Sequence, residues 1–226
     1  MKNVLLLLTA SLFIISCTKS DLASVELKSE DEKAFYTIGY SWGEKLKGLN
    51  ISPDEFNALM KGASASVNEK KPEVDLKSYS EKIAKMAKIR SESSSHNEKE
   101  SGKKFIADYL KNNSAAKQTA SGLVYEVIKE GTGKKPGASD TVEVHYHGTL
   151  TNGVVFDSSV KRNKTISFPL NRVIRGWTEG LQLVKEGGKI KLIIPSDLAY
   201  GNAGAPPSIP GGATLIFEVE LFKVNP

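Results

Sequence analysis

Residues 173–181 read VIRGWTEGL, and this stretch decides how the C-terminal half of the chain must be built. Val173 and Ile174 end a short extended run, and the residues after them open a short helix, which we expect at about 172–184. Val173, Ile174 and Trp177 come close together here, and none of them can act as a nucleophile, a base or a metal ligand. If this turn is the working part of an enzyme, its reaction must need no bond-making group.

On both sides of this turn, apolar residues alternate with polar ones at a period of two, which predicts β-strands. The alternation is clear in four segments, at 123–127, 142–146, 190–194 and 215–221. Asn152-Gly153 predicts a hairpin between two further strands. We therefore predict an α+β domain over 119–226, an antiparallel sheet wrapped around one short helix.

The N-terminal half of the chain has a helical period instead. Phe35, Ile38 and Trp42 recur at steps of three and four residues, and a third helix is expected at about 75–90. Between them, Ser52 can cap a helix that Pro53 begins, with Glu55 completing a capping box. These features predict an all-α region over 31–90.

The apolar faces of these helices are wide for so small a unit, which buries little core by itself. Packing against a second copy would remove more apolar surface from water. We therefore prefer a homodimer formed through residues 31–90, with a monomeric helical cap as the alternative.

The segment between the two halves is strongly polar. Residues 90–104 read RSESSSHNEKESGKK and contain no large apolar side chain. A helix there would be polar on all sides, so we expect a solvent-crossing bridge or a partly disordered segment. Phe105, Ile106 and Tyr109 then restore an apolar face, and we place a connecting helical arm over 91–118.

The first residues of the chain predict export. A basic start is followed by an almost wholly apolar run over 4–15, which is too short to span a bilayer and typical of a signal peptide. The sequence Ile14-Ile15-Ser16-Cys17 resembles a bacterial lipobox, which implies removal of 1–16 and lipidation of Cys17. The expected location is the cell envelope, lipid-anchored to a membrane and facing the periplasm or the cell surface, with 17–30 as a tether. The alternative is a plain secretory signal with an incidental cysteine.

Composition and motifs exclude several kinds of chemistry. The formal charge is +5 over 226 residues, and the lysines alternate with acidic residues, so we expect no nucleic-acid partner. Cys17 is the only cysteine, and no Cys, His or carboxylate cluster has metal-ligand spacing. There is no nucleophile elbow and no phosphate-binding glycine loop. We therefore expect no metal and no cofactor.

Five segments together resemble the FKBP-type peptidyl-prolyl isomerase domain, in matching order and spacing. They are VHYHGTL (144–150), VVFDSSVKRN (154–163), VIRGWTEGL (173–181), LAYGNAGAPPSIP (198–210) and ATLIFEVEL (213–221). The resemblance covers about residues 120–225. More weakly, YTIGYSWGEKL (36–46) and the stretch at 104–133 are similar to the helical dimerisation region of bacterial periplasmic FKBPs, including the macrophage infectivity potentiator type.

The resemblance implies a pocket for a proline ring. Trp177 would be its floor, and Tyr200 and the Ile174 backbone N–H would donate hydrogen bonds to a substrate carbonyl. The expected catalytic residues are Tyr146, Phe156, Asp157, Tyr200 and Phe217. The expected substrate-binding residues are Arg162, Ile166, Val173, Ile174, Trp177 and Ile209. Asp157 and Arg162 would match the family's buried acid and its basic neighbour.

The chain departs from the family pattern in some places, among them Arg175, where many envelope members have Pro. Ile166 stands where many members carry an aromatic wall, which would make that side of the pocket shallower. The resemblance implies a macrolide inhibitor as a ligand, and the segment 205–208 changes the loop over the pocket that would bind it. Taken singly, Trp177 would be read as core and Asp157 with Arg162 as a surface pair. The ordered set of matches favours the pocket.

The activity that the resemblance implies also explains the unreactive turn. Rotation about an X–Pro bond crosses a barrier of about 18–20 kcal/mol, and no covalent step is needed. A dry aromatic pocket disfavours the polar planar amide relative to the twisted one, which is differential binding. We expect proline-containing polypeptide clients. A holdase-type chaperone with secondary isomerase activity, or a surface interaction protein, remains the alternative.

Overall fold

The computed structural model describes residues 25–226. The expected signal peptide, Cys17 and most of the tether lie outside the described residues. The chain divides into two compact units, one ending at Ser41 and the other covering Trp42–Pro226. Within residues 25–226, no helix has the length and apolar content needed to cross a membrane.

The N-terminal helices begin and end close to where the sequence predicts. Helix α1 spans Glu30–Leu46 and buries none of its residues. A short 3-10 turn, Lys47–Leu49, leads to α2, Pro53–Val67. The predicted capping box is confirmed, because Ser52 accepts from the Glu55 N–H at 3.3 Å and Glu55 accepts from the Ser52 N–H at 2.8 Å. Arg90 also binds the Glu55 carboxylate, and this bond lowers the pKa of Glu55 to about 2.

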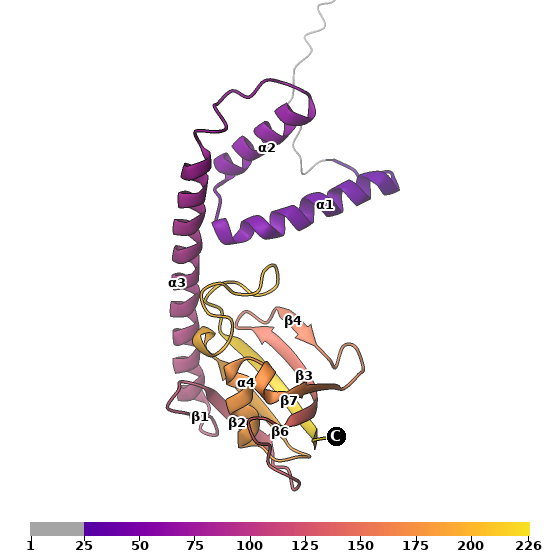
Figure 1. Ribbon diagram of the computed structural model, residues 1–226, viewed down its shortest axis with the longest axis vertical. Coiled ribbons are helices and arrows are strands. Elements are labelled where there is room, and N and C mark those ends of the chain that lie inside the picture. The colour runs from indigo at the N-terminus through magenta and orange to yellow at the C-terminus, as the bar shows by residue number, and fades with distance from the viewer. Residues whose placement is uncertain (1–24) are drawn as a thin grey trace, which may run out of the picture. The chain divides into compact units, whose positions relative to one another are not determined.

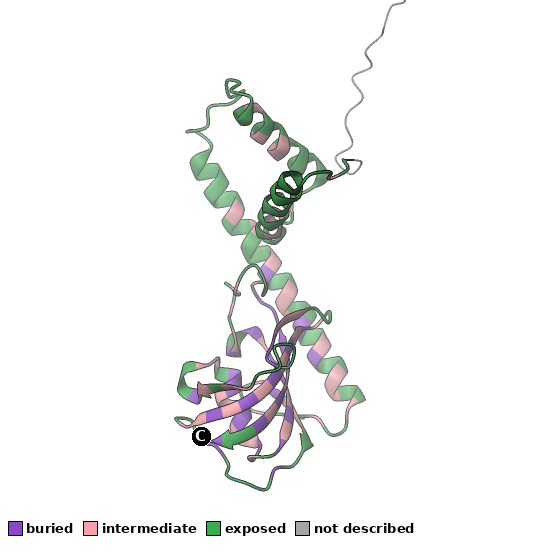
Figure 2. Cartoon of the chain, turned by 90° about the vertical axis from the view of Figure 1, so that its right-hand side faces the viewer, coloured by how far each residue is buried: buried purple, intermediate pink, exposed green. Residues whose placement is uncertain are grey.

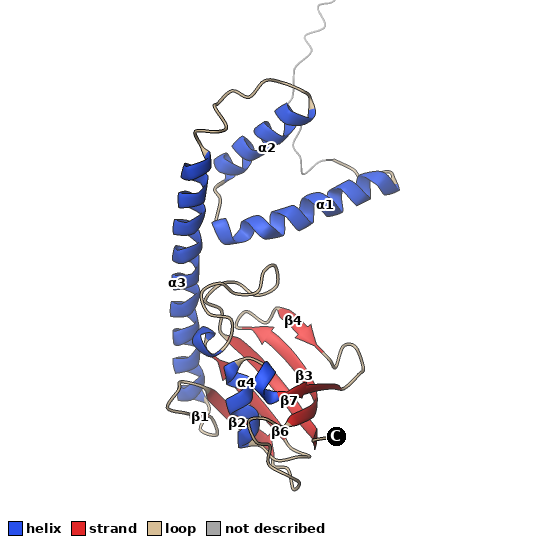
Figure 3. Cartoon of the chain, viewed as in Figure 1, coloured by secondary structure: helices blue, strands red, loops and turns tan. Residues whose placement is uncertain are grey.

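Helix α3 is longer than predicted. It runs without interruption over Ser80–Asn112 (Figures 1 and 3), so the third helix and the connecting arm are one element. The polar stretch is not wholly in solvent either, because Ser95 and Gly102 are buried. Figure 2 shows that α3 is exposed or half-buried along its N-terminal part, and buried residues occur from Ser95 onward.

The C-terminal half is the predicted antiparallel sheet with a short helix. Its strands are β1 Lys117–Gln118, β2 Val124–Lys129, β3 Thr141–Leu150, β4 Val155–Ser158, β5 Ile166–Pro169, β6 Lys189–Ile194 and β7 Leu215–Val224. They lie in the order β1-β2-β6-β7-β3-β4, and β5 also pairs with β3. The hairpin at Asn152-Gly153 is confirmed, with Gly153 at a φ of 83°.

The inner face of the sheet packs on helix α4, Arg175–Gly180, which is shorter than the helix that we expected. Two glycines allow a close approach, because a Cβ at Gly176 would lie 2.3 Å from Ile194 and one at Gly180 would lie 2.6 Å from Leu192. The predicted inward residues of β3, β6 and β7 are buried here. This packing fixes Trp177, on α4, over the middle of the sheet.

The outer face of the sheet is also covered, which the sequence did not predict. Val124 and Ile193 are fully buried in a second apolar cluster, against Ile106 of α3. Beside them, the Tyr109 hydroxyl donates to Glu126 at 2.6 Å, and burial with this bond raises the pKa of Tyr109 to about 12. The second half of α3 is therefore part of the C-terminal half of the molecule.

Candidate active site

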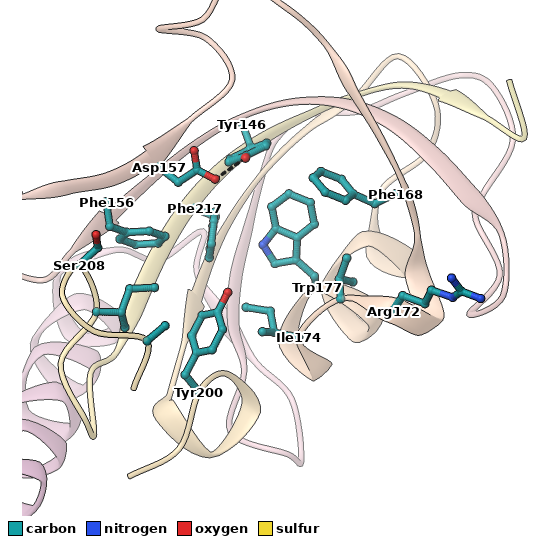
Figure 4. Close-up of a pocket in the computed structure, with 13 residues that line it drawn as sticks. Tyr146, Phe156, Asp157, Phe168, Arg172, Ile174, Trp177, Tyr200, Ser208 and Phe217 are labelled. Atoms are coloured by element: carbon teal, nitrogen blue, oxygen red, sulfur yellow. Dashed lines mark hydrogen bonds between the residues drawn. The ribbon is translucent and has the colours of Figure 1, made fainter. Parts of the chain in front are cut away.

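A hollow of about 650 Å³ opens on the inner side of the sheet, beside α4 (Figure 4). The residues that line it are Tyr146, Phe156, Asp157, Phe168, Arg172, Val173, Ile174, Trp177, Tyr200, Ala205, Ser208, Ile209 and Phe217. They come from β3, β4, β5, β7, the α4 turn and the loop before β7. The lining is mostly aromatic and aliphatic, which suits an apolar ring.

The aromatic residues meet edge to face around Trp177, which is only 4% exposed. Its ring centroid lies 5.3 Å from that of Tyr146, 5.7 Å from that of Phe168 and 5.1 Å from that of Phe217. Phe156 packs on Phe217 at 5.4 Å. Because edge-to-face contacts with several neighbours lock a ring, the floor of the pocket is rigid before any substrate arrives.

Strand register and one glycine bring two of these rings together. Gly148 of β3 lies directly opposite Phe217 of β7. A Cβ at Gly148 would lie 2.8 Å from the Phe156 ring and 2.9 Å from the Phe217 ring. The missing side chain therefore makes the space that both rings fill.

Polar groups gather at one end of the pocket. The Tyr146 hydroxyl donates to Asp157, whose other oxygen accepts from Arg162 Nη1 at 2.5 Å. Arg162 Nη2 also donates to the Tyr146 oxygen at 2.9 Å. Burial alone would raise the pKa of Asp157, but the bonds from Arg162 and Tyr146 outweigh it and hold that pKa below its usual value. Burial and the bond to Asp157 raise the pKa of Tyr146.

Asp157 therefore keeps its negative charge at the mouth of the pocket, where Arg162 and Tyr146 both bind it. The Asp157 side chain is 42% exposed, so the acid that the resemblance makes a buried one lies at the rim. Tyr146 is 5% exposed and carries its hydroxyl from the core to that rim. The arrangement fixes the Tyr146 ring as a wall of the pocket.

Two hydrogen-bond donors of residues that line the hollow have no partner in the described part of the chain. Neither the Tyr200 hydroxyl nor the backbone N–H of Ile174 makes a hydrogen bond among residues 25–226. In Figure 4 the Tyr200 hydroxyl points into the space beside Trp177. Both groups can therefore bind a carbonyl of a bound peptide.

The Trp177 indole N–H is also buried with no acceptor among the described residues. Figure 4 shows its nitrogen turned toward Phe217. An N–H that faces an aromatic ring is weakly compensated. The floor of the pocket therefore offers no strong polar group.

The structure brings most of the predicted site residues together. Those that line one hollow are Tyr146, Phe156, Asp157, Val173, Ile174, Trp177, Tyr200, Ile209 and Phe217. Arg162 does not line the hollow and contacts it through its hydrogen bonds to Asp157 and Tyr146. Ile166 packs on the core and is not part of the lining.

Four lining residues were not among the predicted site residues. Ala205 and Ser208 belong to the segment 205–208, which was expected over the pocket, whereas Phe168 and Arg172 were missed. Phe168 was the easiest to find, because it lies two residues after Ile166 on the same face of β5 and supplies an aromatic wall. Within residues 25–226, no group of three or more metal-binding side chains is placed to hold an ion.

Family models match both halves of the chain. Residues 132–222 match the model described as FKBP-type peptidyl-prolyl cis-trans isomerase, and residues 31–127 match the domain amino terminal to FKBP-type peptidyl-prolyl isomerase. A probable FKBP-type peptidyl-prolyl cis-trans isomerase of Haemophilus influenzae is 40% identical, over 97% of this chain and 96% of its own. The isomerase FkpA of Escherichia coli K12 is 39% identical, over 88% and 77%.

Solved structures agree with these matches. The crystal structure of FkpA from Escherichia coli superposes with a TM-score of 0.68 at 37% identity, covering 89% of this chain and 99% of that one. A peptidyl-prolyl cis-trans isomerase from Pseudomonas syringae gives a TM-score of 0.54 at 38% identity, over 58% and 96%. The helical half and the sheet therefore both have solved counterparts.

Proposed function

The chain belongs to the FKBP-type peptidyl-prolyl cis-trans isomerase family, and from that premise we propose that the hollow over Trp177 is where it accelerates X–Pro rotation. The activity follows from the family, and the relatives do not favour a holdase in which isomerisation is secondary. The convergence of Tyr146, Phe156, Trp177 and Phe217 on one cleft is the observation that carries the site assignment.

The pocket can catalyse without any bond-making group. When the X–Pro amide twists, it loses resonance, and its carbonyl loses charge separation. A planar, polar amide is less favoured in an aromatic hollow than the twisted one, so the pocket binds the transition state better than the ground state. Each tenfold gain in rate needs only about 1.4 kcal/mol of this difference.

The polar groups then orient the peptide. The proline ring lies on Trp177, with Phe156, Phe217 and Tyr146 as walls around it. The Ile174 N–H and the Tyr200 hydroxyl hold flanking carbonyls, so that one side of the amide is fixed while the other rotates. Asp157 and Arg162 keep Tyr146 in place, and no proton has to move.

The assignment is tested by a Phe156→Ala variant of the full chain in a protease-coupled or NMR exchange assay on an Ala-Xaa-Pro-Phe peptide. Removing one wall should lower kcat/KM tenfold or more, about 1.4 kcal/mol of transition-state stabilisation. Val154→Ala is the matched control, because Val154 is exposed and lies outside the pocket. A macrolide that fills the same pocket should compete with the peptide. If Phe156→Ala matches the wild type, the hollow is not the site.

We also propose that residues 31–90 form a homodimer. The support is the amount of apolar surface left uncovered: Phe35 is 73% exposed and Ile38 is 63% exposed, in α1. Ile83 and Ile89 of α3 are more than half exposed as well. Exposed apolar residues in such number mark an association surface in a stable protein.

We further propose that the protein is lipid-anchored in the cell envelope through Cys17 and acts there on proline-containing polypeptides. The support is the apolar run over 4–15 followed by Ile14-Ile15-Ser16-Cys17. Cells that express the wild type and Cys17→Ser should be labelled with radioactive palmitate. Label in the wild type alone supports the anchor, whereas export without label in either chain favours a plain secretory signal.

A further inference from the structure

The loop that closes one side of the pocket is a folded unit. We call residues 196–214 the pocket loop; it connects β6 to β7, and Tyr200, Ala205, Ser208 and Ile209 of this loop line the pocket. Ala205 and Ile209 exchange two backbone hydrogen bonds, at 2.8 and 3.0 Å. The Gly212 N–H also donates to the Gly201 carbonyl at 2.9 Å. These bonds join the outgoing and returning segments of the loop. A displacement of one part of the loop should therefore displace the rest.

The other side of the pocket loop rests on α3 (Figure 1). Ser95 is 4% exposed, and a Cβ on Gly212 would lie 2.2 Å from the Ser95 carbonyl oxygen. One on Gly211 would lie 3.5 Å from the Ser95 Cβ. Helix backbone and loop backbone therefore touch with no large side chain between them.

Two further turns of α3 continue this contact. A Cβ at Gly102 would lie 2.1 Å from Thr214 Oγ1, and Thr214 is 3% exposed. Between the two small residues, Lys99 Nζ binds Asp197 Oδ1 at 2.7 Å. Positions 95, 99 and 102 are spaced by four and three residues, so they lie on one face of the helix.

The position of that face is set independently of the loop. Ile106 is buried against Val124 and Ile193 on the outer side of the sheet. Glu126 accepts from Tyr109 at 2.6 Å and from Asn113 at 2.6 Å. The helix is thus fixed to the rigid sheet, and the pocket loop is supported by the fixed helix.

We propose that α3 from Ser95 onward is part of the isomerase machinery, with Ser95 and Gly102 as positioning residues that hold Tyr200 and Ile209 at the pocket. The inference rests on the site assignment above. It means that residues outside the C-terminal family match complete the active site. Larger side chains at these positions should move the loop outward and weaken substrate binding, leaving the aromatic floor intact.

The first test compares Gly102→Leu with Ser101→Leu in the full chain. Ser101 is the neighbouring residue and is exposed, so both variants add the same side chain to the same helix. We expect Gly102→Leu to lower kcat/KM roughly three- to thirtyfold, mainly through a higher KM, and Ser101→Leu to change it less than twofold. Equal kcat/KM in two folded variants would overturn the proposal.

The second test separates positioning from general damage and remains available if Gly102→Leu does not fold. Gly102→Ala should lower kcat/KM because its methyl group meets the Thr214 side chain. Thr214→Ala removes most of that side chain, so the double variant should recover most of the lost activity. Additive losses would contradict the proposal. Phe156→Ala stays a separate test of the site, whatever the Gly102 variants do.

Discussion

Asp157 shows how one carboxylate depends on its two donors. The bonds from Arg162 and Tyr146 favour its ionised form, and they fix the orientation of a pocket wall at the same time. The Asp157 side chain is 42% exposed, so solvent screens its ion pair with Arg162. The pair therefore serves to orient Tyr146 and adds little to the stability of the fold.

The pH dependence of this group has a definite sign. Because the pKa of Asp157 is lower in the folded chain than its ordinary 3.8, the ionised group stabilises the fold above that value. The contribution is lost as the pH falls from 3.8 through the lower folded pKa. Wild type should therefore be more stable than Asp157→Asn at neutral pH, and the difference should shrink below about pH 4. Urea unfolding across this range measures it, and a gap that does not narrow would contradict the prediction.

Arg172 gives the rim of the pocket a charge of its own. It is exposed and makes no ion pair with the described residues, whereas Asp157 is neutralised by Arg162. At low salt, a peptide with Glu beside proline should have about two- to fivefold higher kcat/KM than one with Lys. Arg172→Glu should reverse that ratio.

The matched control is Lys164→Glu, which makes the same charge change at an exposed position outside the lining. An unchanged peptide preference is expected for it. If both variants shift the ratio equally, net charge is responsible and Arg172 has no local role.

At this scale the sequence predicts the pocket well, because Tyr146, Trp177 and Phe217 carry the family pattern and fall on apolar faces. The sequence does not predict the role of Gly148, which leaves space for the rings of Phe156 and Phe217 because it has no side chain. Nor does it predict Arg172, since an exposed arginine at the end of a three-residue 3-10 helix has no periodic signal. Contacts between residues distant in the sequence decide both cases.

Among the elements, α3 departs most from the prediction. Its polar stretch over 90–104 predicts a helix exposed to solvent on every side, yet Ser95 and Gly102 are buried. Small residues bury backbone by close approach, and an apolar-periodicity argument does not detect that kind of contact. The capping box of α2, by contrast, depends on four adjacent residues and was predicted correctly.

The docking of α3 can be measured through Tyr109. Tyr109→Phe removes the bonds to Glu126 and Asn113, and should lower the free energy of unfolding by about 0.5–1.5 kcal/mol at neutral pH. The pKa of Tyr109 is raised to about 12, so the wild-type advantage is present below the ordinary value of 10 and is lost as the pH rises toward 12. Urea unfolding at pH 8 and above 10 follows both effects. Tyr40→Phe, an exposed tyrosine, should show neither.

In the whole molecule, the two halves differ in how much of their apolar surface is buried within one chain. The sheet buries a complete core within one chain, and its pocket needs no second copy. The N-terminal helices leave many of their large apolar residues exposed, among them Phe35, Ile38 and Phe56. Dimerisation would therefore change how many pockets act on one client, without changing the chemistry in each pocket.

This separation makes the dimer testable. Phe35→Glu with Ile38→Glu should convert a dimer to a monomer at micromolar concentration in light scattering, because charges replace the exposed apolar stripe of α1. Thr37→Glu, off that stripe, should leave the mass unchanged. The monomer should keep full kcat/KM on a tetrapeptide, yet it should lose rate on a long client with several prolines, since the two pockets of the dimer are no longer joined. A wild type that is monomeric, or a double variant that stays dimeric, would show that these residues do not form the association surface.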